Sequence, residues 1–257
     1  MSLKVVILAG GYGTRLAEET ETRPKPMVEV GGKPILWHIM KHFGRYGLKE
    51  FFIALGYRGD VIKRFFLEHH TLSGDITVDL ATGRADVISP AVADWIVHMV
   101  ETGEPTLTGG RIKRLEASLK DGTFMVTYGD GVSNVPLDEL IAFHRRQGRL
   151  ATVTAVRPAA RFGGITFDGD RVAAFSEKSQ IQEGWINGGF LVFEPEVFRY
   201  LSGDDDVLEV DLLERLAEQG QLSAYRHEGF WQCMDTLRDK RYLERLWLEG
   251  NPPWKTW

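Results

Sequence analysis

Short apolar runs alternate along this chain with segments of helical periodicity, and this alternation limits the possible folds to a few. Runs rich in β-branched and aromatic residues predict strands at Lys4–Ala9, Glu50–Leu55, Asp75–Leu80, Ile96–Glu101, Thr123–Tyr128, Ala151–Val156 and Gly184–Glu194. Amphipathic segments predict helices at Pro34–Tyr46, Asp60–Glu68, Gly109–Leu119, Pro136–Gln147, Pro195–Leu201, Asp211–Glu218 and Leu237–Leu248. Because strands joined through helices pair in parallel by right-handed crossovers, the sequence predicts an α/β fold with a Rossmann-like, doubly wound, mostly parallel sheet. The segment Arg161–Phe175 is predicted to be a hairpin-like insert, a small additional β lobe.

Length and composition are those of an ordinary globular chain. Its 257 residues are enough for one large α/β domain or two small ones, and its net charge of −5 argues against a nucleic-acid partner. The single cysteine, Cys233, excludes an intramolecular disulfide and a cysteine-based metal cage. No apolar stretch is long enough to span a bilayer and the opening run is too short for a signal peptide, so we expect a cytoplasmic protein with no membrane partner.

The first predicted strand runs into a glycine cluster, Gly10-Gly11-Tyr12-Gly13, which Thr14 and Arg15 follow directly. Glycines let a ligand approach the backbone N–H groups closely, and an arginine offers a planar fork of donors that matches phosphate oxygens. The loop is therefore predicted to hold a polyphosphate.

Two common phosphate loops do not fit this cluster. A Walker A loop needs Gly-Lys followed by a hydroxyl residue, whereas Gly32-Lys33 is followed by Pro34. A dinucleotide fingerprint needs a third glycine where Leu16 stands, and an acid near the end of the second strand, where the chain has Ala54-Leu55-Gly56. A plain turn is the remaining alternative, and Gly-Gly-x-Gly-Thr-Arg directly after a buried strand is more specific than that.

A second cationic position follows in Arg23-Pro24-Lys25-Pro26-Met27. The two prolines restrict the backbone on both sides of Lys25 and disfavour a helix there. A solvated surface lysine rarely needs such bracing, whereas a lysine that must meet a phosphate at one position does.

Two aspartates are candidate metal ligands. Asp130 follows the strand that ends at Tyr128, at the sheet edge where ligands of α/β proteins bind, although an aspartate between glycines is also a common turn former. Asp235 is either an N-cap for the helix beginning near Leu237 or a second oxygen ligand. The pair suits Mg²⁺, which commonly uses one or two carboxylates together with phosphate oxygens.

The histidines and the cysteine offer less. His38 and His42 lie four residues apart on a predicted helix, but Ile39 stands where a zinc protease has glutamate. All seven histidines are predicted to be structural or surface residues, and nothing marks Cys233 as a nucleophile.

The glycine loop with Arg15, together with Lys25 between its two prolines, resembles the signature of the sugar-1-phosphate nucleotidyltransferases. The resemblance implies the doubly wound, mostly parallel sheet of that family. Nearly the whole chain is similar to the branch of this family that uses CTP and glucose 1-phosphate, and Thr108-Gly109-Gly110-Arg111 and the stretch from Phe230-Trp231-Gln232 to Asp239-Lys240 indicate that branch. Ser179 and Cys233 depart from the pattern of that branch, which usually has proline at both places.

The resemblance implies roles for individual residues. Catalytic roles fall on Arg15, Lys25, Asp130 and Asp235, with Mg²⁺ held by Asp130 and Asp235. Nucleotide contacts are expected from Leu8, Ala9, Gly10, Gly11, Tyr12, Gly13, Thr14, Arg15, Lys25, Thr106 and Arg111. Contacts with the sugar phosphate are expected from Tyr128, Gly129, Glu177, Lys178, Asn187 and Gly188.

The same resemblance implies an activity and an assembly. It implies Mg²⁺-dependent transfer from CTP to glucose 1-phosphate, which supplies CDP-glucose for dideoxyhexose and O-antigen synthesis, in a homo-oligomer that is a hexamer in relatives. We expect one domain over residues 1–257, with a nucleotide-binding part to residue 148 and a sugar-binding, metal-completing part from residue 149. The same transfer with UTP, dTTP or another hexose 1-phosphate, and a catalytically silent regulatory subunit, stay open as alternatives. The aromatic tail Asn251–Trp257 is expected to dock on the body or on a neighbouring subunit.

Overall fold

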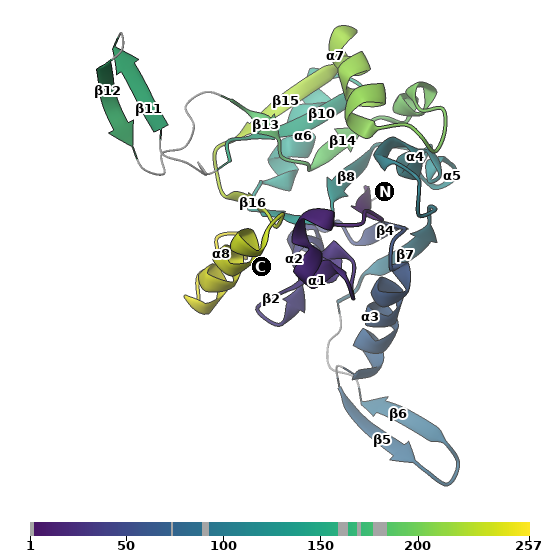
Figure 1. Ribbon diagram of the computed structural model, residues 1–257. Helices are drawn as coiled ribbons and strands as arrows, with labels where there is room; N and C mark the ends of the chain where they lie inside the picture. The colour runs from purple at the N-terminus through teal and green to yellow at the C-terminus, as the bar shows by residue number, and fades with distance from the viewer. Residues whose placement is uncertain (1–2, 73, 89–92, 159–163, 169–170, 177–183) are drawn as a thin grey trace.

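The first strand lies in the middle of a mixed, mostly parallel sheet. A computed structural model describes residues 3–72, 74–88, 93–158, 164–168, 171–176 and 184–257 (Figure 1). Strand β1 (Lys4–Ala9) pairs in parallel with β4 (Glu50–Leu55) and with β8 (Phe124–Tyr128), and β4 pairs in parallel with β7 (Ile96–Glu101). The predicted parallel core of the sheet is confirmed.

The other half of the sheet contains its antiparallel pairs. Strand β14 (Leu191–Phe193) runs antiparallel to β8 and to β10 (Ala151–Val156), and the short β13 (Ile186–Asn187) also pairs with β10. Strand β15 (Leu222–His227) completes this side in parallel with β10. The sheet order is therefore not the order of the chain, as in other doubly wound folds.

Helices cover both faces of the sheet. The sequence of β1 is almost entirely apolar because the side chains on both faces of this strand are buried. Val5, Ile7 and Ala9 pack into one core, and Val6 and Leu8 pack into the other. The first core receives side chains of α2 (Ile35–Arg45), α3 (Gly59–Leu72), α6 (Leu137–Gln147) and α8 (Leu237–Leu248). The second core receives side chains of α4 (Thr108–Lys113), α5 (Glu116–Leu119), the 3-10 helix η3 (Pro195–Tyr200), the π-helix η4 (Leu208–Glu214) and α7 (Arg215–Glu218).

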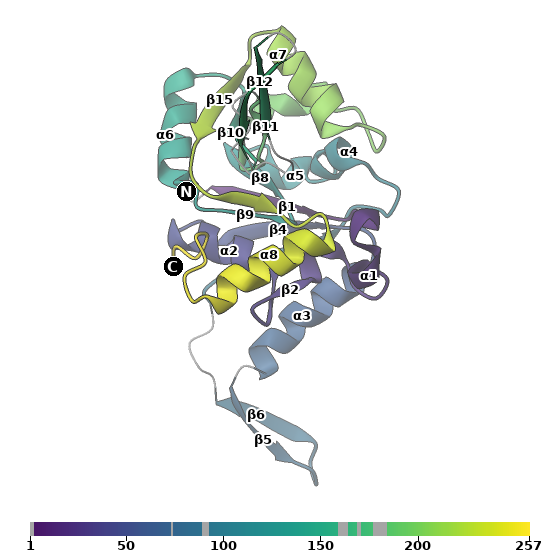
Figure 2. The same cartoon turned by 60° about the vertical axis from the view of Figure 1, so that its left-hand side comes forward.

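Two hairpins lie outside this layered body. Strands β5 (Asp75–Asp79) and β6 (Arg84–Ile88) form a hairpin that projects beyond α3 in both views (Figures 1 and 2). The predicted strand Asp75–Leu80 is thus real but does not join the main sheet. Strands β11 (Gly164–Asp168) and β12 (Arg171–Ser176) form the second hairpin, which confirms the expected β lobe. Residues 161–163 of the predicted insert lie outside the described residues.

Several predicted helices and one predicted strand have a different form in the structure. The helix predicted at Gly109–Leu119 is two short helices, the one at Pro195–Leu201 is a 3-10 helix, and the one at Asp211–Glu218 is α7 preceded by η4. The strand predicted at Gly184–Glu194 is divided into β13 and β14, because Gly189 and Phe190 have positive φ values of 77° and 48°.

Six strands in the described part of the chain were not predicted. Strand β15 is paired on one side only and is largely half-buried, so its sequence has no strong apolar pattern. Four others are too short for a periodic signal, and they are β2 (Glu29–Val30), β3 (Lys33–Pro34), β9 (Gly131–Ser133) and β16 (Trp231–Cys233). The segment Arg84–Ile88, now β6, likewise appears only with its partner β5.

The aromatic tail docks on the body. Trp254 is 1% exposed, stacks on Phe230, and donates its Nε1–H to Nδ1 of His38 at 3.4 Å. The first of the two predicted docking places is therefore confirmed. Among the residues that the structure describes, no helix is both long and apolar enough to cross a membrane.

Candidate active site

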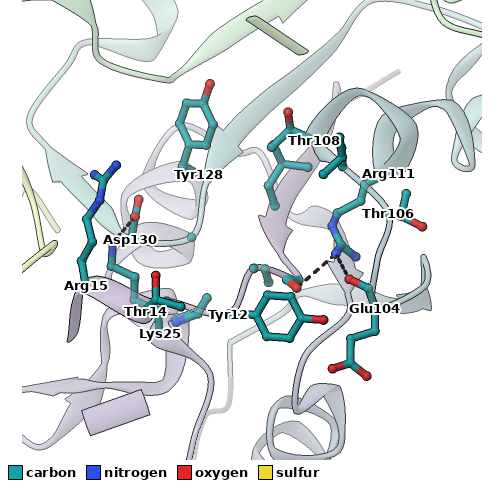
Figure 3. A pocket seen from close by; sticks show the side chains of 18 of the residues that line it. Tyr12, Thr14, Arg15, Lys25, Glu104, Thr106, Thr108, Arg111, Tyr128 and Asp130 are labelled. Atoms are coloured by element: carbon teal, nitrogen blue, oxygen red, sulfur yellow. Dashed lines mark hydrogen bonds and ion pairs between the residues drawn. The ribbon is translucent and has the colours of Figure 1, made fainter. Parts of the chain in front are cut away.

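A cavity of about 420 Å³ opens at the carboxyl ends of β1 and β8 (Figure 3). All residues predicted to contact the nucleotide line it, which places Thr106 and Arg111 beside the glycine loop although they are about a hundred residues further along the chain. Figure 3 shows Arg15, Lys25 and Asp130 on one side of the cavity, and Glu104, Thr106 and Arg111 on the other. Gly129, predicted for the sugar side, also lines this cavity.

Arg111 is buried against the glycine loop. Its Nη1 donates to Leu55 O, Thr102 Oγ1 and Gly103 O, and its Nη2 donates to Gly10 O and Glu104 O, at distances of 2.7 to 3.1 Å. A Cβ added to Gly10 would lie 2.2 Å from Arg111 Cζ, so only glycine admits the guanidinium there. Arg111 therefore holds together the backbone segments that surround the nucleotide cavity.

Lys25 lies at the start of a short 3-10 helix, η2 (Lys25–Met27), whose first turn is set by the flanking prolines. Pro24 has an extended backbone, and the N–H of Met27 donates to Pro24 O at 2.8 Å. Gly13, with φ of +65°, turns the glycine loop so that the Cβ of Lys25 passes close to it. The side chain of Lys25 is only 12% exposed. The prolines were expected to disfavour a helix here, and this is wrong for a single 3-10 turn, because proline is tolerated in the first turn of a helix.

The ammonium of Lys25 lies between two carboxylates from distant parts of the chain. It donates to Asp130 Oδ2 at 2.6 Å and to Asp235 Oδ1 at 2.5 Å. Burial lowers the pKa of Lys25, but the charges of Asp130 and Asp235 raise it more, so its pKa is raised overall. Burial raises the pKa of Asp235, and Lys25 and Arg15 outweigh that effect, so the Asp235 carboxylate has a lowered pKa. Arg15, largely exposed, reaches Asp235 Oδ2 at 3.4 Å.

The start of α8 shows which of the two interpretations of Asp235, helix N-cap or oxygen ligand, agrees with the structure. The N-cap of this helix is Thr236, whose hydroxyl accepts from the Asp239 N–H at 3.3 Å in a capping box. Asp239 Oδ2 in turn accepts from the backbone N–H groups of Asp235 and Thr236. Asp235 is therefore not the cap, and its carboxylate is free to face Lys25.

A second cavity of about 250 Å³ shares Arg15, Tyr128, Asp130 and Asp235 with the first. Asn187 and Gly188 line it, as predicted for the sugar side, together with Trp231 and Cys233. Trp231 donates its Nε1–H to Gly188 O at 2.8 Å, which ties β16 to the wall of the cavity. Glu177, Lys178 and Ser179 lie outside the described residues.

Comparison with known proteins agrees with this geometry. The model of the nucleotidyl transferase family matches residues 4–239. The chain belongs to the nucleotidyl transferase family. It is 48% identical to the glucose-1-phosphate cytidylyltransferase of Salmonella typhi, and the match covers 99% of this chain and 100% of that one. It is 42% identical to a probable glucose-1-phosphate cytidylyltransferase of Bacillus subtilis, with the same coverage.

A solved structure supports the fold of this nucleotidyltransferase. The crystal structure of HddC from Yersinia pseudotuberculosis, complexed with GMP-PN, superposes with a TM-score of 0.68 over 95% of this chain and 99% of that one. The two sequences are 23% identical, so this likeness concerns the fold alone. It agrees with the predicted α/β, mostly parallel sheet.

Asp130 and Asp235 fit the divalent metal that nucleotidyltransferases generally use. Both carboxylates already point at one positive charge, the ammonium of Lys25, and their donor atoms are the hard oxygens that such ions prefer. Within the described residues no group of three or more acidic, histidine or cysteine side chains converges, so the remaining ligands would come from phosphate oxygens and water.

Sequence reasoning missed several residues of the site. Glu104, Leu107 and Thr108 line the nucleotide cavity, and Trp231 and Cys233 line the second one. Thr108 and Trp231 stand in the two motifs that indicated the CTP-using branch, which was the available signal. Burial, followed by the charges of Asp235 and Asp130, raises the pKa of the Cys233 thiol to about 12, so this residue is a poor nucleophile, as expected.

Three of the four buried histidines in the described residues, His38, His42 and His144, have structural partners. His38 lies against Val30 O and Trp254, His42 against Val135 O and Thr256, and His144 against Thr152 and Glu194. None of the three lines either cavity, which confirms the prediction for these residues.

Proposed function

We propose that this nucleotidyltransferase transfers the cytidylyl group of CTP to α-D-glucose 1-phosphate, giving CDP-glucose and diphosphate. The observation that carries the reaction type is the position of Lys25, whose ammonium lies where the nucleotide cavity and the second cavity share Asp130 and Asp235. The choice of CTP and glucose rests on the names of the full-length relatives at 48% and 42% identity.

The reaction needs alignment more than acid–base chemistry. The phosphate oxygen of the sugar is already anionic at neutral pH, so it can attack the α-phosphorus of CTP without a general base. The new bond joins that oxygen to the α-phosphorus, while the bond from the α-phosphorus to the bridging oxygen breaks and diphosphate leaves. Lys25 would contact both the α-phosphate and the sugar phosphate, and Arg15 would contact the departing diphosphate.

Mg²⁺ is the metal that we propose for Asp130 and Asp235. When bound, the ion would neutralise part of the negative charge on the phosphates. The protein's own residues would orient the substrates: Gly10, Gly11 and Gly13 through their N–H groups, and Thr106 and Arg111 on the nucleotide side. Asn187, Gly188 and Tyr128 would face the hexose, and the resemblance assigns Glu177 and Lys178 to the sugar and its phosphate.

The chain divides between these two tasks. Apart from Asp235, the residues that line the nucleotide cavity all precede residue 148. Asn187, Gly188, Trp231 and Asp235, all after residue 149, complete the second cavity. We therefore propose a nucleotide-binding part up to residue 148 and a sugar-binding, metal-completing part after it, within one domain of residues 1–257.

We also propose a homo-oligomer, a hexamer by resemblance to the family. Ile76, Val78 and Leu80 alternate along the projecting β5–β6 hairpin and are 38%, 53% and 91% exposed. An isolated two-stranded hairpin is marginally stable, so contact with another copy of the chain would cover this apolar edge. Light scattering after gel filtration measures the assembly, and a monomer at all concentrations would contradict this proposal.

A cytoplasmic location of the protein stays a prediction.

One assay tests the function. Diphosphate release from glucose 1-phosphate is measured with CTP, UTP, ATP, GTP and dTTP, each with and without Mg²⁺. Activity confined to CTP and Mg²⁺ is the expected result. Activity with UTP or dTTP would instead support the alternative nucleotide, and no release with any nucleotide would indicate a silent regulatory homologue.

A further inference from the structure

Glu209 lies directly behind the wall that the two cavities share. It is the second residue of the π-helix η4, and neither cavity is lined by it. Its Oε1 lies 2.5 Å from the hydroxyl of Tyr128, and its Oε2 lies 3.2 Å from the hydroxyl of Thr108. Tyr128 lines both cavities and Thr108 lines the nucleotide cavity (Figure 3), so one carboxylate contacts a side chain on each side.

The directions of these hydrogen bonds are determined by the chemistry of the groups. A carboxylate only accepts, so the hydroxyls of Tyr128 and Thr108 both donate to Glu209. The hydroxyl of Thr108 also accepts from the N–H of Leu208 at 2.9 Å. Both roles of the Thr108 hydroxyl are thus filled inside the protein, and η4 is attached to the first residue of α4.

Asn187 defines the second partner of Tyr128. Its Oδ1 accepts from the N–H of Gly189 at 2.9 Å, which turns the amide so that Nδ2 donates to the Tyr128 hydroxyl at 3.3 Å. The single proton of that hydroxyl is already directed at Glu209. The capacity that remains toward a ligand is therefore an acceptor.

The position of Glu209 in η4 keeps the Tyr128 hydroxyl donating to it, because a carboxylate can only accept. Single π-helical turns inside helical segments are rare and are often found at functional sites. Here η4 places the Glu209 carboxylate against a residue that lies 81 positions earlier in the chain.

We propose that Glu209 is a positioning residue that makes the Tyr128 hydroxyl an acceptor for one hydroxyl of the hexose. This inference rests on the proposed function, in which Tyr128 and Asn187 face the sugar. A hexose that presents a donor to Tyr128 is favoured. A sugar that presents only an acceptor at that carbon meets an oxygen whose proton points away from it.

A double-mutant cycle between Glu209→Ala and Tyr128→Phe tests this role. Removing the Glu209 carboxylate frees the Tyr128 proton, so the KM for glucose 1-phosphate is expected to rise about 3- to 10-fold, the range for one hydrogen bond. Tyr128→Phe is expected to have a similar effect. If Glu209 acts through the Tyr128 hydroxyl, the double variant shows the same KM as Tyr128→Phe alone.

Controls separate this role from a structural one. Glu209→Gln keeps an acceptor for Tyr128 and is expected to restore the KM partly. Glu194→Ala is the matched control, because Glu194 also accepts from a threonine hydroxyl, that of Thr123, and from His144, but lines neither cavity. Its KM for glucose 1-phosphate should equal that of the unmodified enzyme. Melting curves check that each variant folds, and if Glu209→Ala does not, Glu209→Gln takes its place in the cycle.

The outcomes distinguish a failure of the proposed function from a failure of the role of Glu209. No turnover of CTP and glucose 1-phosphate by the unmodified enzyme would overturn the proposed function itself. With turnover present, additive effects of the two substitutions, or an unchanged KM in Glu209→Ala, would overturn the role of Glu209 and leave the function standing. Monodeoxyfluoro analogues of glucose 1-phosphate give a further readout: the one analogue that the unmodified enzyme disfavours through Tyr128 should lose that penalty in Tyr128→Phe.

Discussion

The ammonium of Lys25 donates to Oδ1 of Asp235 at 2.5 Å, although 210 positions separate the two residues in the chain. The same ammonium donates to Asp130, so one cation holds together the two carboxylates that are proposed to bind the metal. In the proposed mechanism, a bound metal ion and the substrate phosphates would compete with these two ion pairs of Lys25.

Lys25→Met is expected to lower the turnover number by about 10² or more, because removing one preorganised electrostatic donor typically costs roughly 2.7–4 kcal/mol in the transition state. Steady-state diphosphate release measures the effect. The control is Lys63→Met, which removes a half-exposed lysine that is paired with Glu101 and lines neither cavity. Near-normal turnover in Lys25→Met would remove Lys25 from the proposed mechanism.

The same substitution is expected to strengthen metal binding by the free protein. The ammonium competes with a divalent ion for the oxygens of Asp130 and Asp235, so its loss makes oxygens of both carboxylates available to the ion, with Asp235 still facing the exposed Arg15. Electron paramagnetic resonance of Mn²⁺, without nucleotide, measures the dissociation constant, which should fall several-fold. Asp130→Asn is expected to weaken binding in either background. A dissociation constant that is unchanged or larger in Lys25→Met would show that the ammonium does not occupy the metal position.

Arg111→Lys is expected to destabilise the protein by about 3 kcal/mol, because hydrogen bonds of a charged group contribute roughly 1.5–3 kcal/mol each and a lysine cannot reach the five oxygens around the guanidinium. Urea denaturation measures the loss. The matched control is Arg114→Lys on the same segment, which disturbs only an exposed pair with Asp204 and should cost far less stability. Equal losses in the two variants would contradict a supporting role for Arg111 beneath the glycine loop.

Acid is expected to destabilise the protein through His42. Burial lowers the pKa of His42 from its usual 6.5 to about 4. Between these pH values His42 is protonated in the unfolded chain but neutral in the folded protein. Stability from this residue is complete above pH 6.5 and is lost as the pH falls towards 4. At about 1.4 kcal/mol per pKa unit, the contribution is on the order of 3 kcal/mol.

His42→Gln tests this dependence, because glutamine can still donate to Val135 O and accept from Thr256. Urea denaturation at pH 7, 6, 5 and 4.5 is expected to show a flatter decline in the variant. A decline as steep as that of the unmodified protein would assign the acid sensitivity to other groups, among which His38 and His144 also have pKa values lowered by burial.

Much of the phosphate site was predictable because its signals are local. The glycine loop and Arg15 follow one strand, Lys25 stands between two prolines, and Asp130 follows another strand. In a parallel sheet the carboxyl ends of neighbouring strands meet at one edge, so these segments had to lie near one another once β1 and β8 were paired.

Other features depend on contacts that leave no pattern in the sequence. The position of β15 beside β10 and the π-helix η4 before α7 each result from packing between distant segments. Local propensity cannot choose among such arrangements, because the alternatives differ in tertiary contacts and not in backbone preference.

The sequence alone therefore determined the doubly wound sheet, the glycine loop after its first strand and the lysine between two prolines, since apolar periodicity, glycine and proline act within a few residues. Only the tertiary structure decided that Asp235 faces Lys25 and that Glu209 stands behind Tyr128. In these pairs the two residues are 210 and 81 positions apart in the chain. They meet only after the strands and helices that carry them have packed together.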